Sequence, residues 1–335
     1  MAMNEYKSIL TDIRNKIYKP IYLLMGEEPY FIDKISDYIE QTVLTEPEKA
    51  FNLMIFYGKD STALNIIHTC NRFPMMANHQ VVIIKEAQDL KDFDQLIYYI
   101  EKPLKSTILV ICYKYKKLDK RKKITALLMK NAVVFESDKI KEDKLLIWIN
   151  EYLKQKRYTI TPQASAMLID HAGNDLGKLA NELNKLIIVL GDKEAITPDA
   201  IEKNIGISKE FNTFELNNAL GERNIYKANR IANYLAKNQR TTPIIVTITN
   251  LYSYFCKLLV IQTTHIKDRN KLAAEIGVHP FYLKDYEKAA RHYPINRIKQ
   301  IIPMLREYDL KAKGMGSLSA ENGDLLRELV FKILH

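Results

Sequence analysis

The sequence predicts an α/β domain with a parallel sheet, followed by a region made only of helices. Two observations lead to this prediction. Short apolar runs alternate with helical patterns over the first 140 residues, and helical patterns alone fill the rest. Strands that are buried on both faces read as continuous apolar runs, and their alternation with helices favours a parallel sheet covered on both sides. The 335 residues are enough for two or three domains.

Five apolar runs in the first 140 residues are predicted to be strands. They are residues 21–25, 52–57, 81–84, 108–112 and 132–135. Directly after the first run, Phe31, Ile35, Tyr38 and Ile39 lie on one face at the spacing of an amphipathic helix. The first strand is therefore expected to lead straight into a helix.

Three more helices are predicted between the later strands. One begins with Asp60 or Ser61 as its N-cap. Its apolar side is expected to carry Leu64, Ile67 and Cys70. The other two helices are expected at about 90–101 and 119–130.

The remaining residues predict two helical domains, at 141–208 and 209–335, separated by a loop near Gly206. Helices in the first are expected at 141–157, from Thr161-Pro162, at 174–190 and from Thr197-Pro198. Helices in the second are expected at 211–220, 224–238, 241–264, 270–276, 280–291, 295–312 and 319–334. Glycine and proline mark most of the breaks between them.

Composition narrows the class of protein. The net charge of +10 favours an acidic partner such as nucleic acid, although a lysine-rich solvated surface gives the same balance. Cys70, Cys112 and Cys256 are far apart and form no metal-binding spacing, as expected of reduced thiols in the cytoplasm. The N-terminus lacks the apolar core of a signal peptide, and no run of 18 apolar residues predicts a membrane span. We therefore expect a cytoplasmic protein that neither spans a membrane nor holds a metal.

The place where an α/β domain usually binds phosphate lacks the necessary residues. A phosphate-binding loop reads GxxxxGK[ST], in which lysine reaches the phosphates and the hydroxyl holds Mg²⁺. Residues 26–33 read GEEPYFID, so only the first glycine is present. The third strand ends in Lys85-Glu86, where a metal-holding carboxylate is needed first. ATP hydrolysis by this chain, and a bound cofactor, are not expected.

Four segments in order resemble the delta subunit of the bacterial DNA polymerase III clamp loader, a relative of the AAA+ proteins. They are residues 21–30 (IYLLMGEEPY), 173–186 (GNDLGKLANELNKL), 214–220 (FELNNAL) and 308–314 (YDLKAKG). Each string is short, but together they span most of the chain, and the family shares the loss of the phosphate loop. The resemblance implies an AAA+-like parallel-sheet domain at 1–140, a helical lid at 141–208 and a helical collar at 209–335.

The resemblance also implies a function. The family's delta subunit binds the ring-shaped sliding clamp and holds one of its interfaces open. ATP-hydrolysing partner subunits control this step, and the collar joins them while primed DNA passes through the complex. The chain would then be grouped with the DNA-directed DNA polymerases, which are nucleotidyltransferases. This grouping would rest on membership of the holoenzyme alone. Two alternatives stay open from the residues alone: a divergent AAA+ ATPase and a general nucleic-acid-binding protein.

The family's clamp contact is an apolar pair that follows a helix and precedes the third strand. In this chain that position holds Met75 and Met76, with Phe73 beside them. Pro74 ends the preceding helix and favours an extended backbone, so the side chains that follow are expected on a loop. Taken without the resemblance, the two methionines are more simply expected to pack under the sheet. With the resemblance, they are expected to bind the clamp.

A basic run follows the fourth strand and has two interpretations. It consists of Lys114, Lys116, Lys117, Lys120, Arg121, Lys122 and Lys123. Such a run attracts phosphate, and Tyr113 and Tyr115 among the lysines could stack on bases. A solvated loop leading into a helix gives the same sequence. The run is therefore a candidate DNA contact and nothing more specific.

Overall fold

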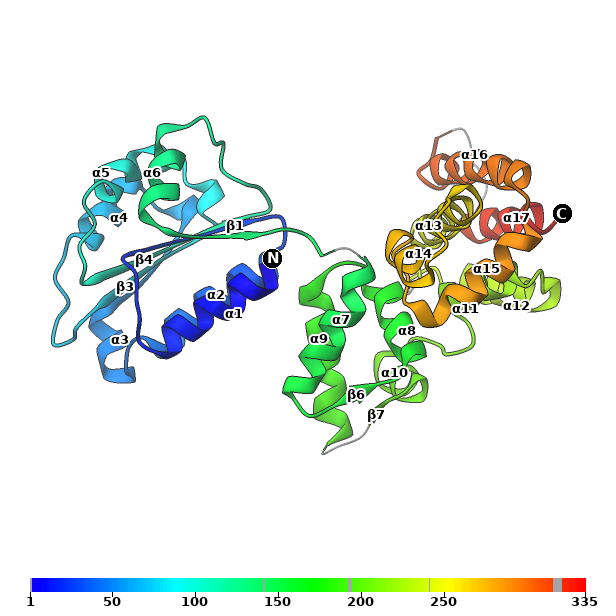
Figure 1. Ribbon diagram of the computed structural model, residues 1–335, viewed down its shortest axis with the longest axis horizontal. Coiled ribbons are helices and arrows are strands. Elements are labelled where there is room, and N and C mark those ends of the chain that lie inside the picture. The colour runs from blue at the N-terminus through cyan, green and yellow to red at the C-terminus, as the bar shows by residue number, and fades with distance from the viewer. Residues whose placement is uncertain (1, 141, 192–194, 241, 316–320) are drawn as a thin grey trace. The chain divides into compact units, whose positions relative to one another are not determined.

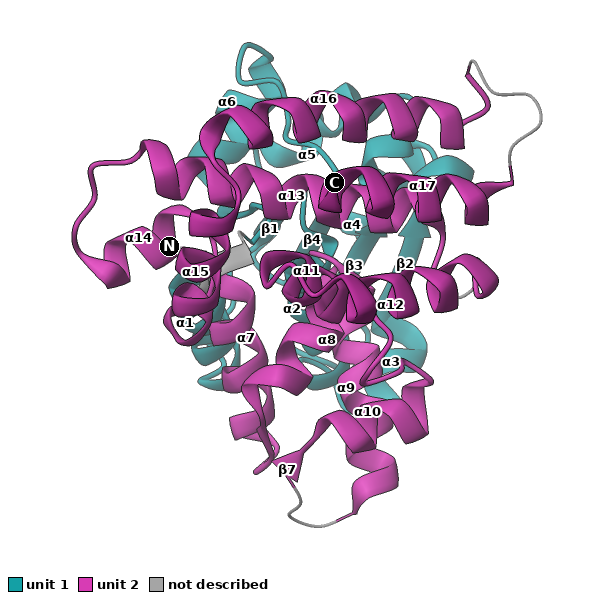
Figure 2. Ribbon diagram, turned by 90° about the vertical axis from the view of Figure 1, so that its right-hand side faces the viewer, with its two compact units in different colours: residues 1–140 teal, residues 141–335 magenta. Residues whose placement is uncertain are grey.

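The computed structural model describes residues 2–140, 142–191, 195–240, 242–315 and 321–335. The chain divides into two compact units, Met1–Ile140 and Lys141–His335, which Figure 2 draws in separate colours. The first unit contains the large sheet, and the second is almost entirely helical (Figure 1).

The first unit is built on a five-stranded parallel sheet. Its strands are β1 (Ile21–Gly26), β2 (Leu53–Tyr57), β3 (Gln80–Lys85), β4 (Thr107–Lys114) and β5 (Val133–Ser137). Their order across the sheet is β2-β3-β4-β1-β5, and every pair is parallel. The five predicted strands and the predicted α/β class are thus confirmed. In a parallel sheet of this kind, the carboxyl ends of the strands share one edge, where α/β proteins usually bind ligands.

Helices cover both faces of the sheet. One face carries α1 (Ala2–Arg14) and α2 (Pro29–Thr42), and the other carries α4 (Ala63–Cys70), α5 (Ile97–Ile100) and α6 (Lys123–Asn131) (Figure 1). A short helix, α3 (Glu46–Asn52), leads into the edge strand β2. The sequence analysis identified neither α1 nor α3 as a helix. Of the apolar positions predicted for α2, Phe31, Ile35 and Ile39 are buried, whereas Tyr38 is only half-buried.

The buried side of helix α4 was predicted only in part, because Cys70 is buried but Leu64 is not. Its N-cap is Thr62, whose side chain accepts a hydrogen bond from the Asn65 N–H, and neither Asp60 nor Ser61 has this role. Starting the helix at Ala63 turns Ala63, Ile66 and Cys70 toward the core. Leu64 is exposed and Ile67 is only half-buried as a consequence.

The helices expected at 90–101 and 119–130 are shorter than predicted. The first is replaced by the 3₁₀ turns η2 (Ala87–Asp89) and η3 (Phe93–Leu96) before α5. Asp92 accepts hydrogen bonds from the Ala63 N–H, so its side chain caps α4. In the second, the Asp119 side chain accepts the Arg121 N–H at 3.0 Å and holds a turn, so that α6 begins only at Lys123.

The second unit begins with four helices. They are α7 (Glu142–Gln155), α8 (Pro162–Ala172), α9 (Leu176–Leu190) and α10 (Pro198–Ile205). Thr161 and Thr197 cap α8 and α10 as predicted. A two-stranded parallel sheet of β6 (Thr159–Ile160) and β7 (Ala195–Ile196), which was not predicted, joins the residues in front of these two helices.

The rest of the second unit is a helical bundle with its own core. Its elements are α11 (Thr213–Gly221), α12 (Ile225–Lys237), α13 (Ile244–Thr263), α14 (Arg269–Glu275), η4 (Pro280–Tyr282), α15 (Leu283–His292), α16 (Ile295–Ala312) and α17 (Asn322–Leu334). The predicted helices are all present, with ends that differ by a few residues. The part of the helix expected at 319–320 lies outside the described residues.

Within the described residues, α13 alone is long and apolar enough to cross a membrane. Its sequence includes polar residues such as Asn250 and Lys257, so it contains no uninterrupted apolar run. Leu251, Phe255 and Leu258 are buried in the bundle core, which accounts for the high hydropathy of this helix. The core of a water-soluble domain needs such a helix as much as a membrane does.

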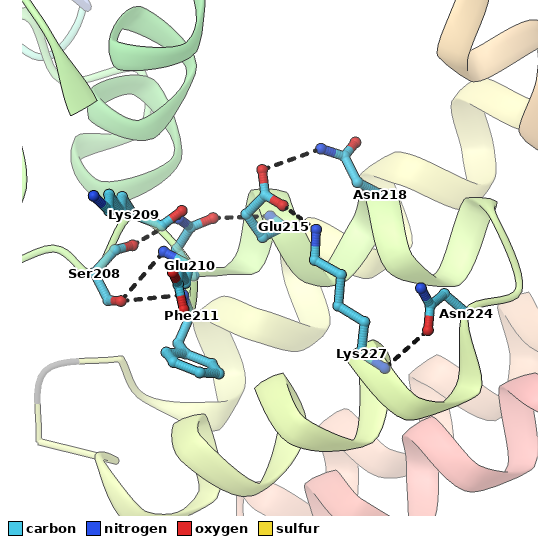
Figure 3. Close-up of polar contacts among 9 residues, drawn as sticks. Ser208, Lys209, Glu210, Phe211, Glu215, Asn218, Asn224 and Lys227 are labelled. Atoms are coloured by element: carbon cyan, nitrogen blue, oxygen red, sulfur yellow. Dashed lines mark hydrogen bonds and ion pairs between the residues drawn. The ribbon is translucent and has the colours of Figure 1, made fainter. Parts of the chain in front are cut away.

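The loop before α11 is held by its own side chains (Figure 3). The Ser208 hydroxyl accepts hydrogen bonds from the N–H groups of Glu210 and Phe211. Asp170 of α8 hydrogen-bonds Thr213 at the start of α11 and Asn250 of α13. Residues on both sides of position 208 therefore contact each other within one compact unit. The division into a lid and a collar stays a prediction.

Candidate functional site

The turn from β1 to α2 is closed by the chain's own carboxylate. Gly26 lies against the Ser137 carbonyl, and with its φ of 141° a side chain at this position would collide there. Glu28 follows as the N-cap of α2 and accepts a hydrogen bond from the Tyr30 N–H at 3.0 Å. Pro29 has no N–H to offer. The helix N-terminus, a position that can bind phosphate, is therefore already capped by the Glu28 side chain.

A lysine fills the neighbouring position at the same edge of the sheet. Lys114 ends β4, is 8% exposed, and places its Nζ 2.8 Å from both the Asp33 and the Glu86 carboxylates. Burial disfavours the charged form of Lys114, but the hydrogen bonds that its Nζ donates to Asp33 and Glu86 outweigh burial, so the pKa of Lys114 is raised. Burial also disfavours the charged form of Glu86. The hydrogen bonds that Lys114 and Gln88 donate to it outweigh burial, so the pKa of Glu86 is lowered. These shifts favour the charged forms of Lys114 and Glu86.

Lys85, at the end of β3, has acidic partners of its own. Its Nζ lies 3.3 Å from Glu40 and 3.7 Å from Asp37, both on α2. Burial disfavours the charged form of Lys85, but the Glu40 carboxylate outweighs burial, so the pKa of Lys85 is raised. The cationic side chains at this edge are therefore engaged inside the unit. Among the described residues, no group of three histidines, cysteines or carboxylates is arranged to hold a metal ion.

The apolar segment between α4 and β3 lies on the surface. Phe73 is 80% exposed, Met75 is 54% exposed and Met76 is 95% exposed. The arrangement in which the two methionines pack under the sheet is therefore not the observed one. Soluble proteins seldom expose large apolar side chains side by side unless another molecule covers them. We call residues 73–76 the apolar loop.

The start of the apolar loop is fixed to the sheet by buried polar groups. The Gln80 carboxamide, at the beginning of β3, donates to the carbonyl of Arg72 at 2.6 Å and to that of Cys70 at 3.1 Å. The Thr107 hydroxyl of β4 also donates to the Cys70 carbonyl, at 2.9 Å. These bonds hold the end of α4 against the sheet, so the chain enters the apolar loop from a defined position.

Most of the basic run is paired with acidic side chains. Lys114 is buried, and Lys117 lies 2.7 Å from Asp138 and 2.8 Å from Glu136. The remaining pairs are Arg121 with Asp119, Lys122 with Asp94 and Lys123 with Glu101. Lys116 lies over the ring of Tyr113, and among the described residues Lys116 and Lys120 have no acidic partner within 4 Å. The structure therefore separates the seven residues into five that are paired internally and two that are available to an anion.

The fold defines a class: an α/β unit with an AAA+-like parallel sheet, followed by a helical unit. Residues 22–138 match the family described as DNA polymerase III, delta subunit. Residues 210–322 match the family described as DNA polymerase III delta subunit, C-terminal domain. The chain belongs to the delta-subunit family of DNA polymerase III, the clamp-loader subunits of DNA replication.

Similar proteins agree with this assignment. The DNA polymerase III subunit delta of Bacillus subtilis is 28% identical over 309 residues, which cover 88% of each chain. The solved structure of the Bacillus subtilis DNA clamp loader delta protein has the same fold, with a TM-score of 0.56 and 24% identity. The match covers 98% of this chain and 99% of that one. Membership of the family implies that the chain works with other clamp-loader subunits.

Proposed function

We propose that this chain binds the sliding clamp through the apolar loop and opens the clamp ring, without hydrolysing ATP itself. The observation that carries the proposal is the exposure of Phe73, Met75 and Met76 on one short loop. This is also the position of the clamp contact in the family that the chain resembles.

The physical chemistry of the apolar loop supports a protein partner. Covering large apolar side chains with another surface removes them from water. The gain in free energy is about 25 cal/mol for each Å² of apolar surface buried. A few such anchors usually provide most of the free energy of a protein interface. Methionine is unbranched and polarisable, so Met75 and Met76 can adapt to an apolar pocket on the clamp.

The charges at the edge of the sheet support the second part of the proposal. A nucleotide bound there would have to displace Glu28 from the start of α2 and Lys114 from Asp33 and Glu86. The chain also offers no lysine or hydroxyl at the phosphate-loop positions. Partner subunits of the loader would then supply the ATP hydrolysis, and no cofactor is needed here.

The remaining partners follow from membership of the loader. We propose that residues 209–335 form the collar that meets the other subunits, and that the protein acts in the cytoplasm with the replication machinery. Primed DNA within the complex is a further partner, and Lys116 and Lys120 are the members of the basic run that can reach it. Transferase activity would belong to the holoenzyme rather than to this chain.

Clamp affinity tests the proposal. Calorimetry with the purified cognate clamp is expected to show binding by the wild type. The Kd of the Met75→Ala/Met76→Ala double variant should be about a hundredfold higher or more, because anchor residues contribute at least about 2 kcal/mol each. Phe281→Ala is the matched control, because Phe281 is also an exposed apolar side chain but lies in the second unit. Equal binding by the wild type and the double variant would remove the apolar loop from the interface.

A further inference from the structure

A buried asparagine holds the apolar loop at its centre. Asn52, the last residue of α3, is 2% exposed. Its Oδ1 accepts the Met75 N–H at 2.7 Å, and its Nδ2 donates to the Met75 carbonyl at 2.9 Å. Both backbone groups of Met75 are thus bound by one side chain that lies 23 residues away in the sequence. Nδ2 also donates to the Glu48 carbonyl at 3.0 Å, which fixes the carboxamide to its own helix.

We infer that Asn52 is a positioning residue for clamp binding: it holds Met75 and Met76 in the conformation that the clamp recognises, although it cannot touch the clamp itself. The inference rests on the proposed function, because it concerns the same apolar loop. Asn52 is covered by the protein, so its effect has to pass through the Met75 backbone.

The loop has little else to order it. Between residues 73 and 78, the two bonds to Asn52 are the only backbone hydrogen bonds that the described structure contains. Gln80 fixes the chain only up to Arg72. A segment without such bonds samples many conformations, and binding then has to order it. With Asn52 in place, Met75 is already held before the clamp arrives.

The backbone of Met76 gives a second reason. Met76 has a φ of 53°, in the left-handed region that residues other than glycine, asparagine and aspartate seldom adopt. This conformation directs a side chain that is 95% exposed away from the unit. Because Asn52 fixes the peptide groups on both sides of Met75, it limits how far Met76 can relax from this conformation. Release of Met75 is expected to let Met76 return to a more common one.

The carboxamide suits this task better than related side chains. A backbone residue presents one donor and one acceptor, and only asparagine or glutamine carries the complementary pair on one planar group. Aspartate could accept the Met75 N–H but would repel the carbonyl groups of Met75 and Glu48. Leucine is close to asparagine in shape and forms no hydrogen bond. Substitution by leucine therefore removes the bonds with little change in the space filled.

The test compares Asn52→Leu and Asn52→Ala with the wild type in three measurements: clamp affinity, thermal unfolding and the hydrogen exchange of the Met75 amide. We expect both variants to bind the clamp about 5- to 30-fold more weakly, because only part of the population would hold the competent loop and the apparent Kd rises by the inverse of that fraction. The Met75 amide should exchange faster in both variants, and in the wild type it should exchange more slowly than the amides of Phe73 and Ala77.

Leu128→Ala is the control for stability alone. Leu128 is buried in α6, whose neighbour β5 forms the sheet edge opposite β2, so the variant should lower the stability of the unit while leaving clamp affinity unchanged. Wild-type affinity in both Asn52 variants, or an unprotected Met75 amide in the wild type, would overturn the positioning role. If the Met75→Ala/Met76→Ala variant still lost binding, the clamp contact itself would stand. A wild type that did not bind the clamp would overturn both.

Discussion

Lys114 joins two acidic side chains at the carboxyl edge of the sheet. It ends a buried strand and lies between Asp33 and Glu86, which neutralise its charge where it leaves the sheet. A buried charge is tolerated only with such partners, and the partners in turn depend on it. The stability of the first unit should therefore respond to the loss of any member of this cluster.

Lys114→Met is expected to destabilise the first unit by about 2 kcal/mol. The change leaves Asp33 and Glu86 near each other without the cation, and the cost is smaller than for a deeply buried pair because both carboxylates remain partly exposed. Native-state hydrogen exchange of the β4 amides measures the effect. Adding Glu86→Gln to Lys114→Met should restore part of the lost stability. If the β4 amides of the single variant exchanged as slowly as in the wild type, the cluster would contribute nothing to stability.

Asp170 predicts a pH dependence in the second unit. Burial raises the pKa of Asp170 to about 6, and its bonds to Thr213 and the Phe214 backbone oppose this only in part. Since the ordinary value is 3.8, the folded chain holds this proton more tightly than the unfolded chain. The contribution of Asp170 to the free energy of unfolding therefore falls as the pH rises from about 4 to about 6. Above about pH 6 this contribution no longer changes with pH.

Asp170→Asn is expected to remove this pH dependence. Relative to the wild type, the variant should gain about 2 kcal/mol in unfolding free energy between pH 4 and pH 7, because one pKa unit corresponds to about 1.4 kcal/mol and part of the change falls below pH 4. Urea unfolding followed by the fluorescence of Trp148, the single tryptophan, reports on the second unit. A constant difference between the two proteins at both pH values would contradict the expectation.

At the scale of elements, α2 is held against the sheet by its own acidic side chains. Helix α2 still starts directly after β1, as it would at a phosphate site, but Glu28 caps it and its acidic side chains Asp33, Asp37 and Glu40 pair with lysines from β3 and β4. The helix and the sheet are thus joined by ion pairs at the edge where a nucleotide would bind.

Nucleotide is therefore expected to leave the thermal stability of the chain unchanged. A ligand that binds the folded state at a hundred times its Kd stabilises it by about 2.7 kcal/mol, which is easily seen as a rise in Tm. Thermal unfolding with millimolar MgATP and without it makes the comparison. A clear rise in Tm would favour the alternative of a divergent ATPase with unusual phosphate ligands.

The basic run predicts only weak DNA binding by the isolated chain. With Lys116 and Lys120 as its available cations, log K should fall with log salt at a slope of about −2, since each phosphate contact contributes about 0.9. Lys116→Ala/Lys120→Ala should abolish this dependence, and Arg121→Ala/Lys122→Ala should change it little. A much steeper slope would indicate a wider nucleic-acid surface and favour a general DNA-binding role.

The parts that the sequence predicted well depend on neighbours in the chain. The five strands are continuous apolar runs and were predicted from the residues alone, whereas the exposure of Met75 and Met76 was expected only from the family resemblance. The partners of the basic run could not be predicted, because Lys114 and Glu86 are 28 residues apart and meet only across the sheet. The role of Asn52 could not be predicted from its neighbours in the sequence either, because its bonds to Met75 depend on how α3 and the apolar loop fold together.

At the scale of the whole molecule, the proposed activity needs no chemistry from this chain. The first unit presents the apolar loop, and the second carries the helices that match the family's C-terminal domain. Opening a closed ring requires only that the chain bind the open form better than the closed form, by at least the free energy that keeps the interface shut. The binding energy of the apolar anchors is the source that the structure offers.

The most direct test is release of a labelled clamp from circular DNA by the purified chain, in the absence of any nucleotide. We expect an excess of wild-type chain to release the clamp, and the Met75→Ala/Met76→Ala variant to leave it on the DNA. A clamp that stays on the DNA with the wild type, or that is released only when ATP is added, would contradict the proposal that this chain opens the ring by binding alone.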